Sequence, residues 1–310
     1  MGKVLLIGEP MAMLIADTVG PLEEVESFTR KLAGAEVNVC IGLTRLEHVT
    51  TYVTHLGQDP FGNYVKATLE KEGISTAFIT FDDVFKTGIM LKGKVLAGDP
   101  HTAYYRKGSA ASKMTPEQME NIDLTGFDLV HMTGILPALS LECRAATKRL
   151  MERAKGAGIA VSFDPNLRPA LWESKEVMVE TLNDLAKLAD LVLPGACEGL
   201  TLVGSDDPVK IADYYQSLGA KQVVVKVGSE GAYARDGVSS SMISGFKVET
   251  VVDTVGAGDG FATGVISGLV EGLSLNEAVR RGNAIGAIQV GHPSDNEALP
   301  TRDELTAYMG

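Results

Sequence analysis

Short apolar segments alternate along the chain with longer segments in which apolar residues recur every three or four positions. The short segments are typical of buried strands: Val4–Ile7, Thr51–Thr54, Leu129–His131, Ile159–Phe163, Asp190–Leu193 and Gln222–Val227. The longer segments are typical of helices: Ala35–Leu46, Phe61–Glu72, Ser140–Gly156, Lys175–Leu188 and Pro208–Leu218. This alternation predicts an α/β fold in which a mainly parallel sheet is covered by helices on both faces.

A glycine-punctuated, β-prone region interrupts the alternation at Thr87–Lys107, and we expect Met11–Ile15 to pair with it. These segments predict a small β lid, inserted from about residues 11–30 and 87–107. The sequence shows no internal repeat, no low-complexity tract and no linker rich in glycine, serine or proline. Residues 1–310 are therefore expected to form a single domain that carries the lid.

Composition and charge narrow the class of protein. The 310 residues are 45% hydrophobic and 22% charged, which is typical of a packed globular enzyme. A net charge of −12 argues against nucleic acid or an anionic membrane as partner, because both bind basic surfaces. Cys40, Cys143 and Cys197 lie far apart without metal-ligand spacing, as expected of thiols in a reducing compartment. No apolar run approaches bilayer length, and a Gly-Glu-Pro interrupts the N-terminal apolar segment, so a cytoplasmic protein is expected.

The most informative motif is the segment V-V-D-T-V-G-A-G-D-G-F at Val251–Phe261. Gly256, Ala257 and Gly258 stand at the expected start of a helix, where unpaired amides and the helix dipole favour an anion. Asp259 would repel a phosphate there unless it holds a metal or accepts a proton from an attacking nucleophile. The motif therefore predicts phosphoryl transfer.

This motif has two other interpretations. In the simpler one, the glycines only form a tight turn and Asp259 only caps the helix. In the other, G-A-G-D-G is a dinucleotide-binding fingerprint, which requires a strand after the helix. The apolar spacing from Leu275 to Ile285 instead predicts a second helix, which argues against that fingerprint. The chain also contains no Gly-x-x-x-x-Gly-Lys-Ser/Thr loop, so a P-loop is excluded.

Taken together, these segments resemble the ribokinase-like, PfkB-type sugar kinases over nearly the whole chain, which implies a three-layer α/β/α sandwich with a small β lid. The resemblance makes Asp259 the base that deprotonates the sugar hydroxyl. It assigns Gly256, Ala257 and Gly258 to the anion hole for the γ-phosphoryl group of ATP. The segment A-G-A-E-V-N-V at Ala33–Val39 is similar to the family's sugar site, in which Gly34 and Asn38 would contact hydroxyls.

The nucleotide is assigned by the same resemblance. Lys226, Gly228 and Gly231 in V-V-K-V-G-S-E-G-A resemble the family's Lys-x-Gly-x-x-Gly turn, along which the nucleotide would lie. The same glycines could simply join two strands of a hairpin, and both interpretations can hold together. The adenine wall would map onto Asn283 and its neighbours.

Ions are implied as well. Where the family has Asn-x-x-Glu, this chain reads Gly195-Ala196-Cys197-Glu198. Glu198 would act on Mg²⁺ indirectly, through water and phosphate, while Gly195 lacks the family's side-chain amide. A monovalent cation such as K⁺ would lie near Asp253 and Ser294.

The substrate is suggested by two arginines. The segments Tyr104–Ala110 and Asp164–Pro169 look most like 2-keto-3-deoxygluconate kinases within the family. Arg106 and Arg168 would grip the carboxylate of a sugar acid through paired hydrogen bonds, and Tyr104 would cover or hydrogen-bond the substrate. Met90 stands where such kinases often carry another tyrosine.

The implied reaction is transfer of the ATP γ-phosphoryl group to the 6-hydroxyl of 2-keto-3-deoxygluconate. Two alternatives stay open: a fructokinase or another PfkB-type sugar kinase, and a sugar-acid-binding protein with impaired catalysis, favoured only by Gly195. The partners expected are the sugar acid and ATP. A homodimer or higher homo-oligomer is also expected, because lids of this family often pair between subunits.

Overall fold

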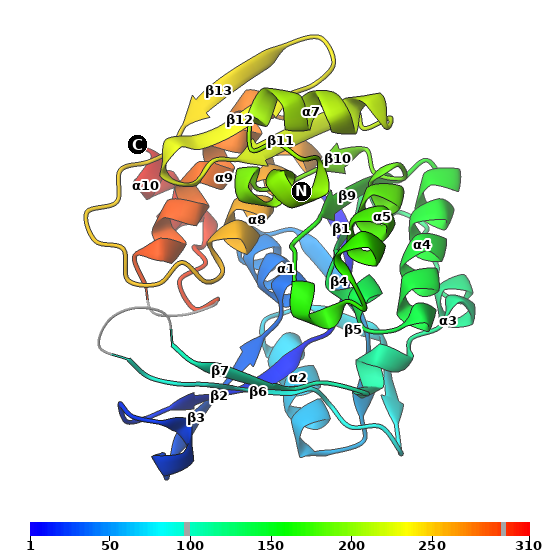
Figure 1. The fold of residues 1–310 in the computed structure, drawn as a ribbon, viewed down its shortest axis with the longest axis vertical. Helices are drawn as coiled ribbons and strands as arrows, with labels where there is room; N and C mark the ends of the chain where they lie inside the picture. Colours follow the sequence, from blue (N-terminus) through cyan, green and yellow to red (C-terminus); the bar gives the residue numbers. More distant parts are fainter. Residues whose placement is uncertain (96–99, 293–295) are drawn as a thin grey trace.

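The computed structural model describes residues 1–95, 100–292 and 296–310. In these residues nine strands form one sheet, in the order β13-β12-β11-β10-β9-β8-β1-β4-β5 (Figure 1). The strands are β1 (Lys3–Ile7), β4 (Val49–Gly57), β5 (Ser75–Asp82), β8 (Leu129–Thr133), β9 (Ala160–Asp164), β10 (Leu191–Val192), β11 (Gln222–Lys226), β12 (Gly231–Arg235) and β13 (Ser240–Ser244). Neighbours from β5 to β11 run parallel, whereas β12 and β13 add to the sheet in antiparallel pairs.

Helices cover both faces of this sheet. One face carries α1 (Ala35–Arg45), α2 (Pro60–Lys71), α8 (Ala257–Val270), α9 (Leu275–Val290) and α10 (Arg302–Met309). The other carries α3 (Pro116–Glu120), α4 (Leu141–Gly156), α5 (Lys175–Ala186), α6 (Ala196–Leu202) and α7 (Pro208–Ser217). Short 3-10 turns occur at Leu22–Glu24, Ala110–Lys113, Leu136–Ala138, Pro169–Leu171 and Gly228–Glu230. The predicted three-layer sandwich is confirmed.

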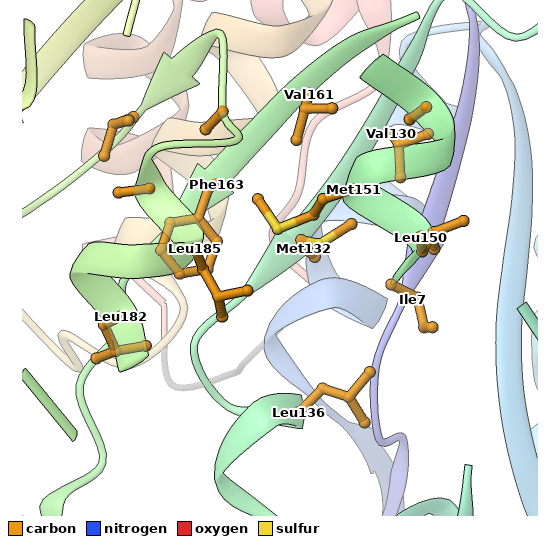
Figure 2. Close-up of a cluster of buried hydrophobic side chains, with 14 of the residues drawn as sticks. Ile7, Val130, Met132, Leu136, Leu150, Met151, Val161, Phe163, Leu182 and Leu185 are labelled. Atoms are coloured by element: carbon orange, nitrogen blue, oxygen red, sulfur yellow. The ribbon is translucent and has the colours of Figure 1, made fainter. Parts of the chain in front are cut away.

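Two hydrophobic cores, one on each face of the sheet, explain why the strands are apolar throughout. Successive side chains of a strand point to opposite faces. In β1, Leu5 and Ile7 accordingly enter one core, while Val4 and Leu6 enter the other. Figure 2 shows Ile7 together with Leu150 of α4 in the core that Leu5 and Ile7 enter. A strand buried on both faces reads as a continuous apolar run, which is why these segments could be predicted.

A second sheet lies at one end of the molecule, beside the main sandwich (Figure 1). Its strands are β2 (Met11–Ala16), β3 (Phe28–Ala33), β6 (Ile89–Lys92) and β7 (Thr102–Tyr105), in the order β3-β2-β6-β7. We call it the lid sheet. The strand β3 runs past residue 30, where the lid was expected to stop. Residues 96–99 of the predicted lid lie outside the described residues.

The predicted strands and helices are all present, with ends displaced by no more than three residues. The strand β5 was not predicted from the sequence. Its side chains are mostly half-exposed at the edge of the sheet, so its pattern lacks a continuous apolar run. The strand β12 was foreseen only through the hairpin alternative at Gly228 and Gly231, which joins it to β11, and β13 was not predicted. No helix in the described part of the chain is long and apolar enough to cross a bilayer.

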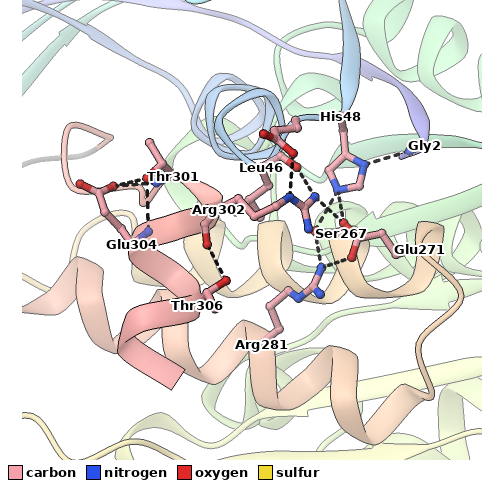
Figure 3. Close-up of polar contacts among 11 residues, drawn as sticks. Gly2, Leu46, His48, Ser267, Glu271, Arg281, Thr301, Arg302, Glu304 and Thr306 are labelled. Carbon is pink, nitrogen blue, oxygen red and sulfur yellow. Dashed lines mark hydrogen bonds and ion pairs between the residues drawn. The ribbon is translucent and has the colours of Figure 1, made fainter. Parts of the chain in front are cut away.

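A partly buried polar network fixes the C-terminal helix to the body (Figure 3). Glu271 lies at its centre, with Arg302 Nη2 at 2.6 Å from one carboxylate oxygen and Arg281 Nη1 at 2.8 Å from the other. His48 accepts a hydrogen bond from the Gly2 amide through Nδ1 and contacts Ser267 Oγ through Nε2. Burial acts to raise the pKa of Glu271, but the two guanidinium groups outweigh it and lower the pKa to about 2.

Replacing Glu271 by Gln should lower the free energy of unfolding at neutral pH by about 2 kcal/mol, because two partly buried guanidinium groups lose a charged partner. The folded-state pKa lies below the ordinary 4.5, so this contribution is complete above pH 4.5 and is lost as the pH falls toward about 2. Urea unfolding from pH 7 down through that window measures the difference between wild type and Glu271→Gln.

The matched control is Glu152→Gln, which removes a surface carboxylate 3.8 Å from Arg149 and should leave stability nearly unchanged. A Glu271→Gln effect no larger than that of the control, or one that does not shrink at low pH, would contradict the role given to the network.

Candidate active site

A cavity of about 440 Å³ opens at the carboxyl ends of the parallel strands. Ligands of open α/β sheets bind at this edge, because the loops that follow the strands meet there. Glu9 follows β1, Gly195 follows β10, and Lys226 ends β11. The lid sheet supplies Met90 and other side chains from the opposite side. We call this the first cavity.

A second cavity of about 680 Å³ adjoins the first one. Its lining includes Gly228, Gly231 and Asn283, and much of the remainder is apolar. Lys226 and the first turn of α8 line both cavities, so a ligand in one would meet a ligand in the other at that turn. The predicted sugar and nucleotide residues thus separate into two neighbouring spaces.

The helix α8 begins at the junction of the two cavities. Gly256 precedes it in the left-handed conformation, with φ 79°, which a residue without Cβ adopts at little cost. The Ala257 amide donates a 3.3 Å hydrogen bond to the Thr254 carbonyl, whereas the amides of Gly256 and Gly258 have no partner among the described residues. Two of the three amides predicted to bind an anion are therefore available at a helix N-terminus.

Asp259 follows these amides and lines the first cavity. Asn38 Nδ2 donates a 2.8 Å hydrogen bond to its Oδ2, and Asn296 Nδ2 donates in turn to Asn38 Oδ1 at 3.0 Å. This chain of amides fixes the orientation of the carboxyl group. Asn38, which was predicted as a sugar ligand, thus orients Asp259 in the absence of a ligand.

The pKa of Asp259 is raised to about 7, first of all by desolvation. The Asp164 carboxylate raises it further, while the Asn38 hydrogen bond, Arg168 and Lys226 lower it. A carboxyl group with a pKa near neutrality can accept a proton from a hydroxyl more readily than one with the ordinary value of 3.8. The geometry and the electrostatics both suit a general base.

Lys226 and Asp164 form a buried ion pair beside Asp259. Lys226 Nζ lies 2.6 Å from Asp164 Oδ2, and the Asn166 amide donates to Asp164 Oδ1 at 3.1 Å. Burial acts to lower the pKa of Lys226, but the carboxylates of Asp164, Glu198 and Asp259 hold it above its ordinary value. Asp164 was not predicted as a site residue, although its place directly after the predicted strand Ile159–Phe163 could have revealed it.

Glu198 is held by the backbone on both sides. Its two carboxylate oxygens accept hydrogen bonds from the Leu167 and Gly195 amides, each at 2.7 Å. Among the described residues, no group of three or more His, Cys, Asp and Glu side chains is placed to hold a metal ion. These residues therefore form no all-protein metal cage, whereas Mg²⁺ in phosphoryl-transfer sites is usually held by one or two carboxylates together with substrate phosphates.

The two predicted arginines differ in their surroundings, although both line the first cavity. Arg106 is buried and pairs with Glu9, its Nε lying 2.6 Å from Oε2, and Ser109 Oγ donates to the same carboxylate. Arg168 is exposed, donates to the Leu167 carbonyl at 2.8 Å, and has no acidic partner among the described residues. Arg168 is thus the more available of the two for a ligand carboxylate.

Other lining residues complete the first cavity. Gly34 caps α1 with φ 144°, and a Cβ there would lie 3.0 Å from the Glu9 carbonyl. Tyr104 on β7 is 54% exposed and stands opposite Met90 on β6. Glu9 also lines this cavity, as does Glu36, a buried residue whose pKa is raised by desolvation, and neither was predicted from the sequence. Both acids lie near β1 and α1, among mainly apolar residues. Their partners are distant in sequence, so no local pattern predicts a role for them.

The glycines that line the second cavity also shape the hairpin, so the two interpretations of this turn are compatible. Gly231 has φ 108°, and a Cβ there would lie 2.1 Å from the Ile243 carbonyl oxygen. Gly228 has φ 63° and open space beside it. Asn283 donates hydrogen bonds from Nδ2 to the carbonyls of Ile243 and Ser244, which fixes α9 against β13.

The position expected for a monovalent cation already carries a protein cation. Lys92 Nζ on β6 lies 3.0 Å from Asp253 Oδ2, and both side chains are largely buried. An ammonium group at this carboxylate repels a second cation. Asp253 is thus paired with Lys92, while Ser294, the other residue expected near a monovalent cation, lies outside the described residues.

Known proteins resemble the chain over almost its full length. Residues 1–302 match the pfkB family carbohydrate kinase. The chain is 48% identical to the 2-dehydro-3-deoxygluconokinase of Bacillus subtilis (strain 168) over 97% of this chain and 94% of that protein. It is 32% identical to the 2-dehydro-3-deoxygluconokinase of Thermoproteus tenax over 99% of this chain and 94% of that protein. The crystal structure of the PfkB protein from Polaromonas sp. JS666 matches with a TM-score of 0.91 and 46% identity, covering 99% of this chain and 100% of that one.

Proposed function

Because the chain belongs to the pfkB family of carbohydrate kinases, we propose that it phosphorylates the terminal 6-hydroxyl of 2-keto-3-deoxygluconate with ATP. The products are 2-keto-3-deoxy-6-phosphogluconate and ADP. Two full-length relatives named 2-dehydro-3-deoxygluconokinase, which is another name for this activity, support the substrate. The observation that carries the chemistry is the Asp259 carboxyl group, whose pKa is raised to about 7 beside the open amides of α8.

In the proposed reaction the sugar lies in the first cavity and the nucleotide in the second. Asp259 accepts the proton of the 6-hydroxyl while the oxygen attacks the γ-phosphorus in line with the leaving ADP oxygen. One O–P bond forms as the bond to ADP breaks. The N-terminal turn at Gly256, Ala257 and Gly258 holds the migrating group, so most of the catalysis comes from positioning and charge.

A sugar acid suits the first cavity better than a neutral sugar. Arg168 offers the substrate carboxylate a guanidinium group that forms no ion pair with a described carboxylate, whereas Arg106 faces the same cavity but is paired with Glu9. Gly34 and Asn38 would contact the sugar hydroxyls, and Tyr104 would cover the substrate. The alternative, a fructokinase, stays open because of Met90. This residue lines the lid side of the cavity where sugar-acid kinases often carry a tyrosine, so a hydroxyl group that could bind the substrate is lacking there.

The nucleotide is proposed to lie along Lys226, Gly228 and Gly231, with its base near Asn283. Magnesium would arrive with ATP as the counter-ion of its phosphates, since the described residues form no cage for it. Glu198 is proposed to hold the loops at Gly195 and Leu167 in place and to act on magnesium indirectly, through water and phosphate. We propose a single domain in which the lid sheet excludes water during transfer.

Replacing Arg168 by Gln should raise the KM for 2-keto-3-deoxygluconate by about tenfold or more, because a charged hydrogen bond to the substrate carboxylate is lost. The KM for fructose, which has no carboxylate, should hardly change. The measurement is ADP release from ATP and magnesium with a panel of 2-keto-3-deoxygluconate, 2-keto-3-deoxygalactonate, gluconate, fructose and ribose.

Two variants control this experiment. Arg149→Gln removes a surface arginine that pairs with Glu120 and should behave as wild type. Asp259→Asn should lower kcat on every accepted sugar by roughly a thousandfold, as expected for loss of the base. Turnover of fructose or ribose alone would contradict the proposed substrate but would still support a sugar kinase. No turnover on any sugar, with tight binding of a sugar acid, would favour the impaired binding protein.

Monovalent cations should have little effect on the rate. Exchanging potassium for tetramethylammonium should change wild-type turnover by less than about twofold, because the Lys92 ammonium already neutralises Asp253. Lys92→Met removes that charge and should make turnover respond to potassium. A wild-type enzyme that requires potassium would contradict this assignment. Chelation of magnesium should abolish turnover by both the wild type and Lys92→Met.

We also propose that the enzyme is a cytoplasmic homodimer in which lid sheets pair. The strand β7 is an edge of that sheet and carries Tyr105, which is 65% exposed. Light scattering at micromolar concentration should give twice the mass of the chain. A monomeric mass would contradict the dimer.

A further inference from the structure

Lys226 lies where the two proposed substrates meet. It ends β11 and lines both cavities, and Gly258 of the anion-binding turn lines both with it. A Cβ built on Gly258 would lie 3.9 Å from Lys226 Nζ. The ammonium group is therefore next to the helix turn that would receive the transferring phosphoryl group.

Three carboxyl groups act on this ammonium group. Asp164 on β9 lies 2.6 Å from Nζ, and the carboxylates of Glu198 on α6 and Asp259 on α8 also act on it. Glu198 is occupied by two backbone amides, so it holds Lys226 only through longer-range attraction. A lysine on a flexible stem can leave one carboxylate for a phosphate nearby, which an arginine in a fixed fork does less readily.

We propose that Lys226 contacts the γ-phosphoryl group during transfer and is a catalytic residue, with Asp164 as the positioning residue that holds it ready between turnovers. This inference rests on the proposed function, and it assigns Lys226 to the reacting phosphate and not to the adenosine part of the nucleotide. A cation at that point neutralises charge that develops between the acceptor and the leaving oxygens.

The test compares nucleotides that do and do not carry the γ-phosphate. For Lys226→Met, calorimetry should show that affinity for the non-hydrolysable analogue adenylyl imidodiphosphate falls by about tenfold, while affinity for ADP is unchanged. In steady-state assays kcat should fall by about a hundredfold or more, with little change in the KM for the sugar acid. Lys226→Arg, which keeps the charge, should recover part of the loss.

The pH profile gives a readout that a purely structural role would not move. Asp164, Glu198, Arg168 and Asn38 face Asp259 or Lys226 and remain in the variant. Because Lys226 lowers the pKa of Asp259, its removal should shift the acidic limb of kcat to higher pH. Lys221→Met is the matched control, since Lys221 precedes the same strand, is 77% exposed at its side chain and pairs with Asp190.

Lys226→Met leaves the buried Asp164 carboxylate unpaired, so the double variant Asp164→Asn/Lys226→Met is measured beside it in case the single variant fails to fold. Equal loss of affinity for ADP and the analogue, or a kcat within threefold of wild type in a folded variant, would overturn the proposal. If wild type phosphorylates no sugar, the proposed function fails, yet the comparison of ADP with the analogue still tests Lys226.

Discussion

The site depends on one constraint: a carboxyl group is kept in a desolvated position beside the N-terminus of a helix. Desolvation raises the pKa of Asp259 to about 7, and the left-handed Gly256 lets α8 begin where its amides face the same space. Asn38 and Asn296 prevent the carboxyl group from turning away. The large two-sided core makes this costly arrangement tolerable, because it stabilises the elements that hold each of these residues.

The positive charges around the site are divided by function in a protein of net charge −12. Arg106 is paired with Glu9 and fixes the lid sheet to the loop after β1, and Lys92 is paired with Asp253. In the proposed mechanism Arg168 serves the sugar acid and Lys226 the phosphate. Each cation is placed by a different element, so the charge of the cavity can be complementary to two anionic ligands without a basic surface elsewhere.

The alternation of strands and helices could be predicted from sequence because the central strands are buried on both faces. The edge strand β5 could not, since its half-exposed side chains give no apolar run. The motif at Asp259 and the sugar segment at Asn38 were found separately. Their hydrogen bond joins residues 221 positions apart, which no local pattern reveals. In the same way, the sequence predicted equal roles for Arg106 and Arg168, and only the contact with Glu9, 97 residues from Arg106, distinguishes them.

The central claim is that Asp259 titrates near neutrality in the folded protein before any substrate binds. Carbon-13 NMR of carboxyl-labelled aspartate, with Asp259→Asn used to assign the resonance, follows this titration directly. The account predicts a midpoint at about pH 7. A midpoint near the ordinary value of 3.8 would show that the carboxyl group is well solvated, and it would contradict the account.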